Sequence, residues 1–480
     1  MYKELNRTNY PGPVYPERIL QFGEGNFLRA FIDWIIDHLN EQIDFNHGVT
    51  IVRPIDSQHP TLNEQEGLYT TIIRGINEQG QAVAKPRIIY SVNREISVYQ
   101  DFQQYLKCAE NPALTFIFSN TTEAGIAFSD KDKLTDAPPA TFPAKLTLFL
   151  YHRFQFFQGA KDRGLIIVPC ELIDYNGEQL KTYVMRYAEL WHLEPAFCEW
   201  LTQANTFCST LVDRIVTGYP KTEVTALTAE LGYQDQFLDT AEYFYLFVIQ
   251  GPAWLKQTLK LDQVNLNIRV VDDIKPYKER KVGILNGAHT ALVPVAYLAG
   301  IRTVGEAMAD PVIAGFVQNL LNQEVIPTLA LDKPALTAFA DDVLKRFKNP
   351  FIRHELMAIS LNSLTKFKTR LLPQLLTYSQ KFKHPPRYIS FALAALIAFY
   401  RGEYQGEVIA LHDEKLLLDK FKTWQPLYVS DVHQLVVNVL GMQSHWECDL
   451  NQVSGLTELV TAHLQRILTQ EIKSVIPQQE

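Results

Sequence analysis

The sequence predicts an α/β N-terminal domain with a mostly parallel sheet, followed by a mainly α-helical C-terminal domain. In the first half of the 480 residues, short β-rich runs alternate with longer helical patterns, as they do in βα units. From about residue 281 onward the strand signals largely disappear and helical periodicity takes over. We therefore expect one domain over residues 1–275 and a helical domain over residues 276–480.

Six segments of the first half have the composition of β-strands. Residues 114–119 and 164–168 are almost wholly apolar, as buried parallel strands are. Residues 68–76 and 82–92 flank a polar Asn-Glu-Gln-Gly turn, so we expect a hairpin beside the main sheet. The remaining strand candidates are residues 18–22 and 49–53.

The second half carries six segments with helical periodicity. The most apolar of them, residues 388–400, is too short to cross a bilayer, which takes about 20 residues, and is expected to be a buried helix. The helix candidates are residues 284–298, 307–322, 336–345, 354–361, 388–400 and 456–472.

Composition excludes several classes of protein. A balance of 45 basic and 53 acidic residues gives a net charge of −8, which argues against a nucleic-acid partner. The five cysteines form no C-x-x-C pair, so neither a disulfide framework nor a zinc ribbon is indicated. The N-terminal residues are polar and unlike a signal peptide, so we expect a cytoplasmic protein without a membrane partner.

A glycine turn lies between the first strand and the first helical pattern. There, Gly23 would permit the tight turn and Gly25 the close approach of a pyrophosphate to the helix N-terminus. Leu28 stands where the usual third glycine would be, so the motif alone is weak, and its position favours a dinucleotide. The residues expected at the cofactor are Phe22, Gly23, Glu24, Gly25, Asn26 and Phe27.

The end of the second strand bears on the choice between NAD and NADP. An acid at this position usually binds the ribose hydroxyls of NAD, whereas an arginine accommodates the 2′-phosphate of NADP. Here the strand ends in Arg53, and Asp56 follows three residues later. Arg53 could accept a 2′-phosphate, and Asp56 could serve NAD, so the residues leave both cofactors open.

A lysine, an asparagine and a histidine are spaced along one predicted helix. On an α-helix, Lys281, His289 and Asn286 fall at about 0°, 80° and 140°, so all three can face one cleft. The rise from Lys281 to His289 is about 12 Å. Because side chains lean toward the helix N-terminus, His289 leans toward Lys281, and a small polyol fits between them.

This combination of side chains suits metal-free hydride transfer. Each residue alone is usually a surface or core residue, and the combination at a domain junction favours a site. A lysine can take the hydroxyl proton of a secondary alcohol, and carboxamide N–H groups stabilise the developing alkoxide by roughly 3 kcal/mol per donor. Imidazole can orient the substrate oxygen. No set of Cys, His and carboxylate residues is spaced for zinc.

These residues resemble the signature of the long-chain mannitol dehydrogenase family. The K-x5-N-x2-H spacing begins at Lys281, and V-D-R-I at residues 212–215, G-E-G-N-F at residues 23–27 and the pair Asn349-Pro350 also fit. The resemblance covers roughly residues 15–470. It implies a Rossmann-type N-terminal domain, a helical C-terminal domain, a small-molecule substrate, NAD as cofactor and no metal.

Three stretches resemble most closely the branch of the family that interconverts D-tagaturonate and D-altronate. They are residues 119–126, 169–177 and 276–290. The resemblance implies that Lys281 is the general acid/base, that Asn176 and Asn286 are oxyanion donors and that His289 binds substrate. It also implies that Ser119, Asn120 and Thr121 contact the cofactor.

The chain departs from the family pattern at two positions. Hexitol-oxidising members usually have a glutamate three residues before the lysine, where this chain has Lys278. Its proton route is therefore expected to differ. Family members often carry a basic residue where Gly283 stands, which puts an anion contact at that position in doubt.

A substrate derived from a uronate carries a carboxylate, so its pocket needs a cation. Basic candidates are Lys366, Lys368, Arg370 and Arg353, of which we expect Lys366 to be the first choice; the alternative for most of them is a solvated basic helix face. By family resemblance, Ser363 and Lys366 line the pocket. Asp213 and Arg214 are expected either to hold polyol hydroxyls or to brace the two domains.

Three alternatives remain open from the residues and the resemblance. A neighbouring branch of the same family would act on D-fructuronate, mannitol or arabinitol. A dinucleotide-binding regulator would keep the fold without chemistry, although the intact set of Lys281, Asn286, His289 and Asn176 argues against it. A metal-dependent dehydrogenase is the third.

Overall fold

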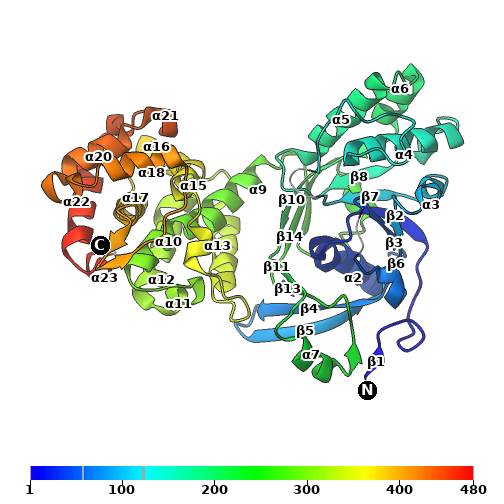
Figure 1. Ribbon diagram of the computed structural model, residues 1–480, viewed down its shortest axis with the longest axis horizontal. Helices are drawn as coiled ribbons and strands as arrows, with labels where there is room; N and C mark the ends of the chain where they lie inside the picture. The colour runs from blue at the N-terminus through cyan, green and yellow to red at the C-terminus, as the bar shows by residue number, and fades with distance from the viewer. Residues whose placement is uncertain (1, 57–58, 122–124, 479–480) are drawn as a thin grey trace. The chain divides into compact units, whose positions relative to one another are not determined.

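The computed structural model describes residues 2–56, 59–121 and 125–478. It forms two compact units. Unit 1 comprises Met1–Asn77 and Val83–Ile274, and unit 2 comprises Glu78–Ala82 and Lys275–Glu480. Unit 1 is α/β and unit 2 is almost entirely helical (Figure 1), so the predicted fold class is confirmed.

A six-stranded parallel sheet forms the centre of unit 1. Its spatial order is β6-β3-β2-β7-β8-β9. Numbered by appearance within this sheet, the strands run 3-2-1-4-5-6, the order of a dinucleotide-binding Rossmann domain. The strands are β2 (Glu17–Phe22), β3 (Gly48–Arg53), β6 (Val92–Ser97), β7 (Phe116–Ser119), β8 (Ile166–Pro169) and β9 (Thr206–Phe207).

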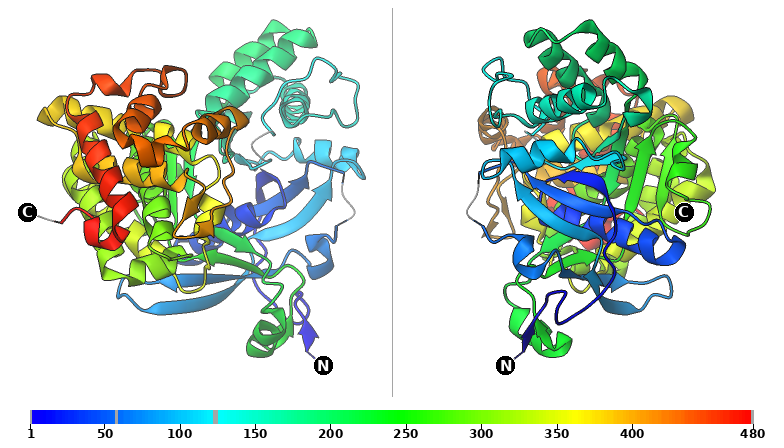
Figure 2. Two further views of the ribbon diagram at one scale, coloured as in Figure 1. Left: turned by 60° about the vertical axis from the view of Figure 1, so that its left-hand side comes forward. Right: turned by 90° about the vertical axis from the view of Figure 1, so that its right-hand side faces the viewer.

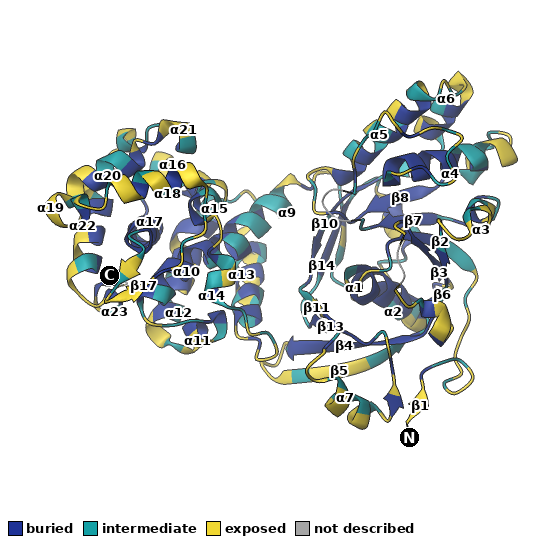
Figure 3. Cartoon of the chain, in the orientation of Figure 1, coloured by how far each residue is buried: buried dark blue, intermediate teal, exposed yellow. Residues whose placement is uncertain are grey.

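Both faces of this sheet are covered, which explains why its central strands β7 and β8 are almost wholly apolar (Figure 3). On one face, Ile51 and Phe118 pack with Ile35 and Leu39 of α2 (Trp34–Ile43). On the other face, alternate strand residues such as Ile117 pack against a second set of helices. Those helices are α3 (Phe102–Cys108), α4 (Phe142–Phe156), α5 (Asn176–Leu190) and α6 (Pro195–Gln203).

The predicted hairpin is present and belongs to a second sheet. Its strands, β4 (Tyr69–Ile76) and β5 (Ala82–Ile89), continue a four-stranded sheet of order β11-β13-β4-β5. A third sheet has the order β10-β14-β15. The later strands of these two sheets were not predicted, and each is short: β10 (Ser209–Asp213), β11 (Val216–Gly218), β13 (Asp239–Glu242), β14 (Leu246–Gln250) and β15 (Ile268–Val271).

Unit 2 is a bundle of helices around one apolar helix (Figures 1 and 2). In α17 (Arg387–Phe399) every residue except Arg387 is buried, and it packs against α10 (Gly287–Leu298) and α22 (Leu456–Thr469). Further helices are α13 (Lys333–Phe347), α15 (Ser363–Arg370), α16 (Leu372–Phe382) and α20 (Val432–Leu440). Within the described ranges, none of the helices combines the length and apolar character that a membrane crossing requires.

Two predicted helices of unit 2 differ from the structure. The helix expected over residues 307–322 is divided into α11 (Val304–Ala309) and α12 (Pro311–Asn319). Asp310 between them caps α12 by accepting from the amides of Val312 and Ile313, and proline at the first helical position fixes the new start. Residues 354–361 contain only the single turn α14 (Leu356–Ile359).

Candidate functional site

The glycine turn follows β2 at the carboxyl edge of the parallel sheet. Gly23 has φ +116°, a conformation that side-chain-bearing residues rarely adopt, and its amide donates to the Val52 carbonyl at 3.0 Å. A Cβ atom on Gly23 would lie 2.9 Å from the Asn120 carbonyl oxygen. Glycine is therefore required here, and the turn brings the ends of β2 and β7 close together.

Gly25 begins the helix that continues from α1 (Asn26–Leu28) through η1 (Arg29–Asp33) into α2. Gly25 is the N-cap, and among the described residues no side chain accepts from the amides of the first turn. A Cβ at Gly25 would meet no described atom within 4 Å. Open space beside uncapped amides is what a pyrophosphate needs at a helix N-terminus.

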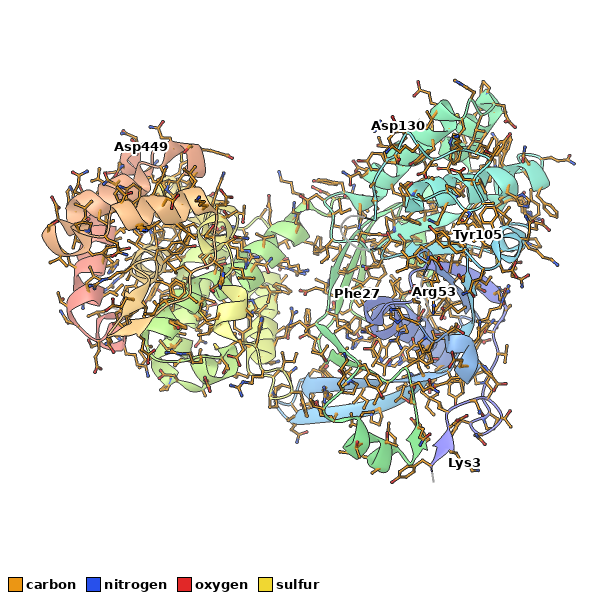
Figure 4. All side chains as sticks on the ribbon, in the orientation of Figure 1. Lys3, Phe27, Arg53, Tyr105, Asp130 and Asp449 are labelled. Carbon is orange, nitrogen blue, oxygen red and sulfur yellow. The ribbon has the colours of Figure 1, made fainter. Side chains whose placement is uncertain are left out.

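Asn26 and Phe27 are fixed by contacts within their own helix. Arg29 donates to the side-chain oxygen of Asn26 and, at 2.6 Å, to the Phe237 carbonyl. The ring of Phe27 (labelled in Figure 4) stacks on Phe31 with centroids 5.0 Å apart. The turn that would hold a dinucleotide is therefore preorganised.

Ser119, Asn120 and Thr121 follow β7, which pairs directly with β2. A single carboxylate, Glu171, holds this segment by accepting from the Ser119 hydroxyl at 3.0 Å and from the Thr121 amide and hydroxyl at 3.1 and 3.0 Å. Asn120 donates to the Cys170 carbonyl at 2.7 Å. Burial raises the pKa of Glu171. Glu171 was not among the predicted site residues, although it lies within residues 169–177, one of the stretches that carry the family resemblance.

The order of the strands places these two segments where a dinucleotide binds in such folds. Strand order reverses between β2 and β7, and ligands of open α/β sheets bind in the crevice at that point. The predicted cofactor residues at the glycine turn and at residues 119–121 therefore flank one crevice.

The side chain of Arg53, one of the two candidates for the cofactor ribose, is engaged by other residues of unit 1. Arg53 is 2% exposed and pairs with Glu95 at 2.5 Å, and it donates to the carbonyls of His59 and Pro60, each at 3.0 Å (Arg53 is labelled in Figure 4). These contacts argue against the alternative in which Arg53 accepts a 2′-phosphate, and the choice between NAD and NADP stays a prediction. Asp56, the alternative residue, is exposed.

Asn176 begins α5 and is fully buried in unit 1. Its amide nitrogen lies 3.1, 3.0 and 3.1 Å from the Pro169 carbonyl, the Glu171 carbonyl and the Thr210 hydroxyl. Its oxygen accepts from the Thr210 amide at 2.8 Å. The side chain thus ties β8 to β10, and donation to a substrate would require one of these bonds to be exchanged. Its role as an oxyanion donor stays a prediction.

Arg214, just beyond β10, is engaged inside unit 1. It donates to the carbonyls of Glu242 at 3.0 Å and Ala30 at 2.8 Å, and its guanidinium lies 4.4 Å from the centre of the Trp34 ring. Burial lowers its pKa to about 10. Asp213, the last residue of β10, is 5% exposed. These contacts make Arg214 an internal brace of this unit, and a substrate contact for either residue stays a prediction.

The helix that carries Lys281 contains a π-helical segment. It runs from α9 (Lys275–Arg280) through η4 (Lys281–Asn286) into α10. The assumption of a regular α-helix, with Lys281 and Asn286 about 140° apart, is therefore wrong. Hydrogen bonds from residue i to i+5 widen the turn, which brings residues five apart closer to one face. Such π segments frequently mark functional sites.

His289 lies one turn further, among aromatic and basic side chains of unit 2. Its ring stacks on Phe347 at 4.1 Å and meets His354 edge-on at 5.1 Å. Burial, with the nearby charges of Arg346, Arg370 and Lys366, holds the pKa of His289 well below its ordinary value. Its Nε2 atom is buried and accepts no hydrogen bond from the described residues. A neutral imidazole with one nitrogen open suits a substrate hydroxyl.

Two predicted carboxylate-binding residues, Lys366 and Arg370, are among the basic side chains around His289. They lie on α15, and burial and the charge of Arg370 lower the pKa of Lys366. Lys366 donates to the Ile359 carbonyl at 2.7 Å, and Arg370 to the hydroxyl of Thr290 at 3.4 Å. The structure therefore places both cations beside the Lys281 helix.

Ser363 and Arg353 differ from this pair. Ser363, at the start of α15, is 5% exposed and donates to the Ser360 carbonyl at 2.6 Å. Arg353 has an 81% exposed side chain and pairs with Glu355 at 2.7 Å. Substrate contacts for these two residues stay predictions, and the exposure of Arg353 makes it the weaker candidate.

Arg346 and His354 were missed by the sequence analysis. Arg346 is the penultimate residue of α13 and is buried. The signal available in the sequence was an arginine at a position that the helical pattern places on the buried face, because arginine is rarely buried unless it is paired. The described part of the chain contains no group of three or more His, Cys, Asp or Glu side chains that could hold a metal ion.

Two features together define a class of dinucleotide-dependent oxidoreductases. The first is a Rossmann sheet with an uncapped glycine turn, and the second is a helical unit in the same chain that carries a lysine, an asparagine and a histidine in sequence. Residues 17–263 match the mannitol dehydrogenase Rossmann domain, and residues 273–468 match the mannitol dehydrogenase C-terminal domain. The chain belongs to the mannitol dehydrogenase family.

Curated relatives match over nearly the full length. The chain is 57% identical to the altronate oxidoreductase of Yersinia enterocolitica, covering 98% of this chain and 99% of the relative. It is 58% identical to the altronate oxidoreductase of Klebsiella pneumoniae strain 342, covering 99% of each.

Solved structures share the fold. A substrate-free D-sorbitol dehydrogenase has a TM-score of 0.81 at 22% identity and covers 97% of this chain and 95% of its own. Mannitol 2-dehydrogenase of Pseudomonas fluorescens, solved with NAD and D-mannitol, has a TM-score of 0.66 at 20% identity and covers 98% of both chains.

Proposed function

We propose that the chain is an NAD-dependent oxidoreductase that interconverts D-tagaturonate and D-altronate, with Lys281 as general acid/base and without a metal. The observation that carries this proposal is the full-length identity of 57–58% to proteins named altronate oxidoreductase. At such identity over 98–99% of the chain, both the dinucleotide-binding unit and the helical unit are shared.

The cofactor residues of the proposal are those that flank the crevice at the carboxyl edge of the sheet. When bound, the dinucleotide supplies or accepts the hydride. The uncapped amides after Gly25 would hold its pyrophosphate. Asp56, exposed after β3, would bind the ribose hydroxyls, and Arg53 is already paired with Glu95, which supports NAD over NADP.

The proton chemistry of the proposal rests on the Lys281 helix. In the direction of reduction, Lys281 gives a proton to the oxygen of the substrate carbonyl, and in oxidation it takes that proton back. Asn286, five residues along the π segment, would donate to the same oxygen while its charge develops. The open Nε2 atom of neutral His289 would receive a neighbouring hydroxyl of the substrate.

The substrate carboxylate fits the basic residues around His289. Lys366, Arg370 and Arg346 all act electrostatically on that histidine, so three cations lie within reach of one small region of unit 2. Their mutual repulsion is relieved when an anion binds among them. A hexitol substrate would bring no such charge, which favours the sugar acid.

The test is NADH oxidation followed by absorbance, with D-tagaturonate, D-fructuronate and D-fructose in parallel, repeated with NADPH. Fast turnover of D-tagaturonate with NADH is the expected result. A preference for D-fructuronate or D-fructose would move the chain to another branch of the family. If the chain turns over none of these three substrates, the proposal is wrong.

A further inference from the structure

A buried ion pair joins the neighbouring strands β3 and β6 in unit 1. Arg53 ends β3 and Glu95 lies in β6, and their side chains are each 3% exposed with 2.5 Å between nitrogen and oxygen. An arginine at the end of the second strand is the residue that accommodates the 2′-phosphate of NADP in this type of fold. In this chain that guanidinium is committed to a carboxylate.

Glu95 is held firmly in place. Its second carboxylate oxygen accepts from the Leu62 amide at 3.0 Å, at the start of η2 (Leu62–Gln65). Its backbone amide and carbonyl both bond to the side chain of Asn63, each at 2.8 Å. The carboxylate therefore cannot turn away from Arg53 without the loss of several bonds. Glu95 also lines a cavity of about 420 Å³.

A second carboxylate reaches the same guanidinium from the glycine turn. Glu24, between Gly23 and Gly25, lies 3.8 Å from the Arg53 side-chain nitrogen and is 25% exposed. The charge of Arg53 is thus offset from both sides. A dianionic phosphate arriving here meets carboxylates rather than an available cation.

We propose that Glu95 is a positioning residue that sets the cofactor preference: it holds Arg53 in an internal ion pair, so the chain binds NAD and discriminates against NADP. This inference rests on the proposed use of a dinucleotide and assigns to Glu95 an action through Arg53. Removal of the carboxylate would leave a buried guanidinium without its main counter-charge. A ribose 2′-phosphate would then supply the missing anion.

The experiment measures binding with the full chain and no sugar substrate. NAD⁺ and NADP⁺ are titrated calorimetrically into wild type and Glu95→Gln, whose amide oxygen can still accept from the Leu62 amide. Adenosine 2′,5′-bisphosphate and AMP serve as probes of the 2′-phosphate alone. We expect wild type to favour NAD⁺, and Glu95→Gln to shift the ratio of the two dissociation constants at least tenfold toward NADP⁺. An unchanged ratio, or equal weakening of both, overturns the inference.

A matched control removes a carboxylate from another arginine of the same sheet. Glu17, the first residue of β2, pairs with Arg94 at 2.7 and 2.9 Å, and Arg94 precedes Glu95 in β6. Glu17→Gln is expected to leave the ratio unchanged. The double variant Arg53→Gln/Glu95→Gln is expected to lose the gain in NADP⁺ affinity. A shift in the control, or a gain that survives in the double variant, overturns the assignment.

If Glu95→Gln does not fold, as judged by circular dichroism, Glu24→Gln takes its place because that side chain is partly exposed. We then expect a smaller shift, about threefold, toward adenosine 2′,5′-bisphosphate over AMP, and no shift overturns the inference. If the wild type binds NAD⁺ but turns over no sugar acid, the proposed substrate is wrong and the inference about Glu95 is unaffected. If the wild type binds neither dinucleotide, or prefers NADP⁺, the inference about Glu95 is wrong.

Discussion

Two buried carboxylic acids lie at the helix of the glycine turn: Asp33 is the last residue of η1, and Asp239 begins β13, which contacts η1. Asp33 is fully buried, with Tyr69 donating to it at 3.2 Å and Gln21 at 3.3 Å, and burial raises its pKa to about 8. Burial likewise raises the pKa of Asp239 to about 7. Both acids therefore keep a proton in the folded chain at pH values where the unfolded chain has released it.

This proton linkage predicts the pH dependence of stability. Between about pH 4 and pH 8 the folded state holds the Asp33 proton and the unfolded state does not, so stability falls as pH rises, by up to about 1.4 kcal/mol per pH unit. The contribution is full below about pH 4 and lost through pH 8. Asp33→Asn is expected to flatten this slope in urea unfolding measured from pH 5 to 9. The exposed Asp56→Asn is the control, and an equal slope in Asp33→Asn contradicts the linkage.

Lys281 is predicted to carry the proton transfer without holding the cofactor. Lys281→Ala is expected to lower turnover by at least about 100-fold, the scale of general acid/base catalysis, and to leave the NADH dissociation constant within about twofold. Lys275→Ala, on the same helix and 64% exposed, is the matched control. Loss of NADH binding together with turnover would mean that Lys281 is structural.

The basic residues around His289 are predicted to select a carboxylated substrate. Lys366→Met and Arg346→Met should each lower kcat/KM for D-tagaturonate by roughly 10- to 100-fold, from about 1.5–3 kcal/mol for a hydrogen bond to a charged group. Any turnover of D-fructose should change little. Lys345→Met, beside Arg346 but 42% exposed, is the control. An equal decline with both substrates would contradict the carboxylate assignment.

At the scale of elements, the glycine turn offers a matched pair of substitutions. Gly23→Ala combines positive φ with a 2.9 Å approach to the Asn120 carbonyl, so we expect a loss of about 1–3 kcal/mol in unfolding free energy. Gly25→Ala has ordinary backbone angles and open space, so its stability should stay near wild type while NADH binds more weakly. Thermal unfolding and NADH titration separate the two. Gly25→Ala with unchanged NADH affinity would place the pyrophosphate elsewhere.

The elements also show what periodicity can and cannot predict. Four strands of the parallel sheet, β2, β3, β7 and β8, were predicted from their apolar runs, and α17 because it is apolar all round. The more polar β6 and the two-residue β9 were not predicted. The π segment was not found, since hydrogen bonds from i to i+5 leave no mark in a hydrophobic pattern. The later strands of the other sheets, each of five residues or fewer, were also not predicted.

At the scale of the whole molecule, the candidate site was predicted unevenly. Residues with a motif could be singled out from the sequence: the glycine turn and the Lys281, Asn286 and His289 set. Glu171, Glu95 and Arg346 act through contacts between segments distant in sequence, and no spacing rule shows these. The ion pair of Arg53 was not foreseen for the same reason, because its partner Glu95 lies three strands further along the chain.

A prediction for the whole enzyme concerns metal dependence. Since the proposed proton transfer is assigned to Lys281, dialysis against EDTA is expected to leave turnover unchanged. The measurement is NADH oxidation before and after dialysis, with added zinc as the control arm. Activity lost on dialysis and restored by zinc would support a metal-dependent mechanism instead.

The central helix of unit 2 has a consequence for biosynthesis. The segment that forms α17 is synthesised before α22, the helix with which it shares most contacts. About 60 residues separate the two helices. At a synthesis rate of about 5–20 residues per second, the apolar helix therefore exists for roughly 3–12 s before α22 is made. A nascent chain paused in this interval exposes an apolar segment, which favours aggregation, and a nonsense codon before residue 456 would leave α17 without α22.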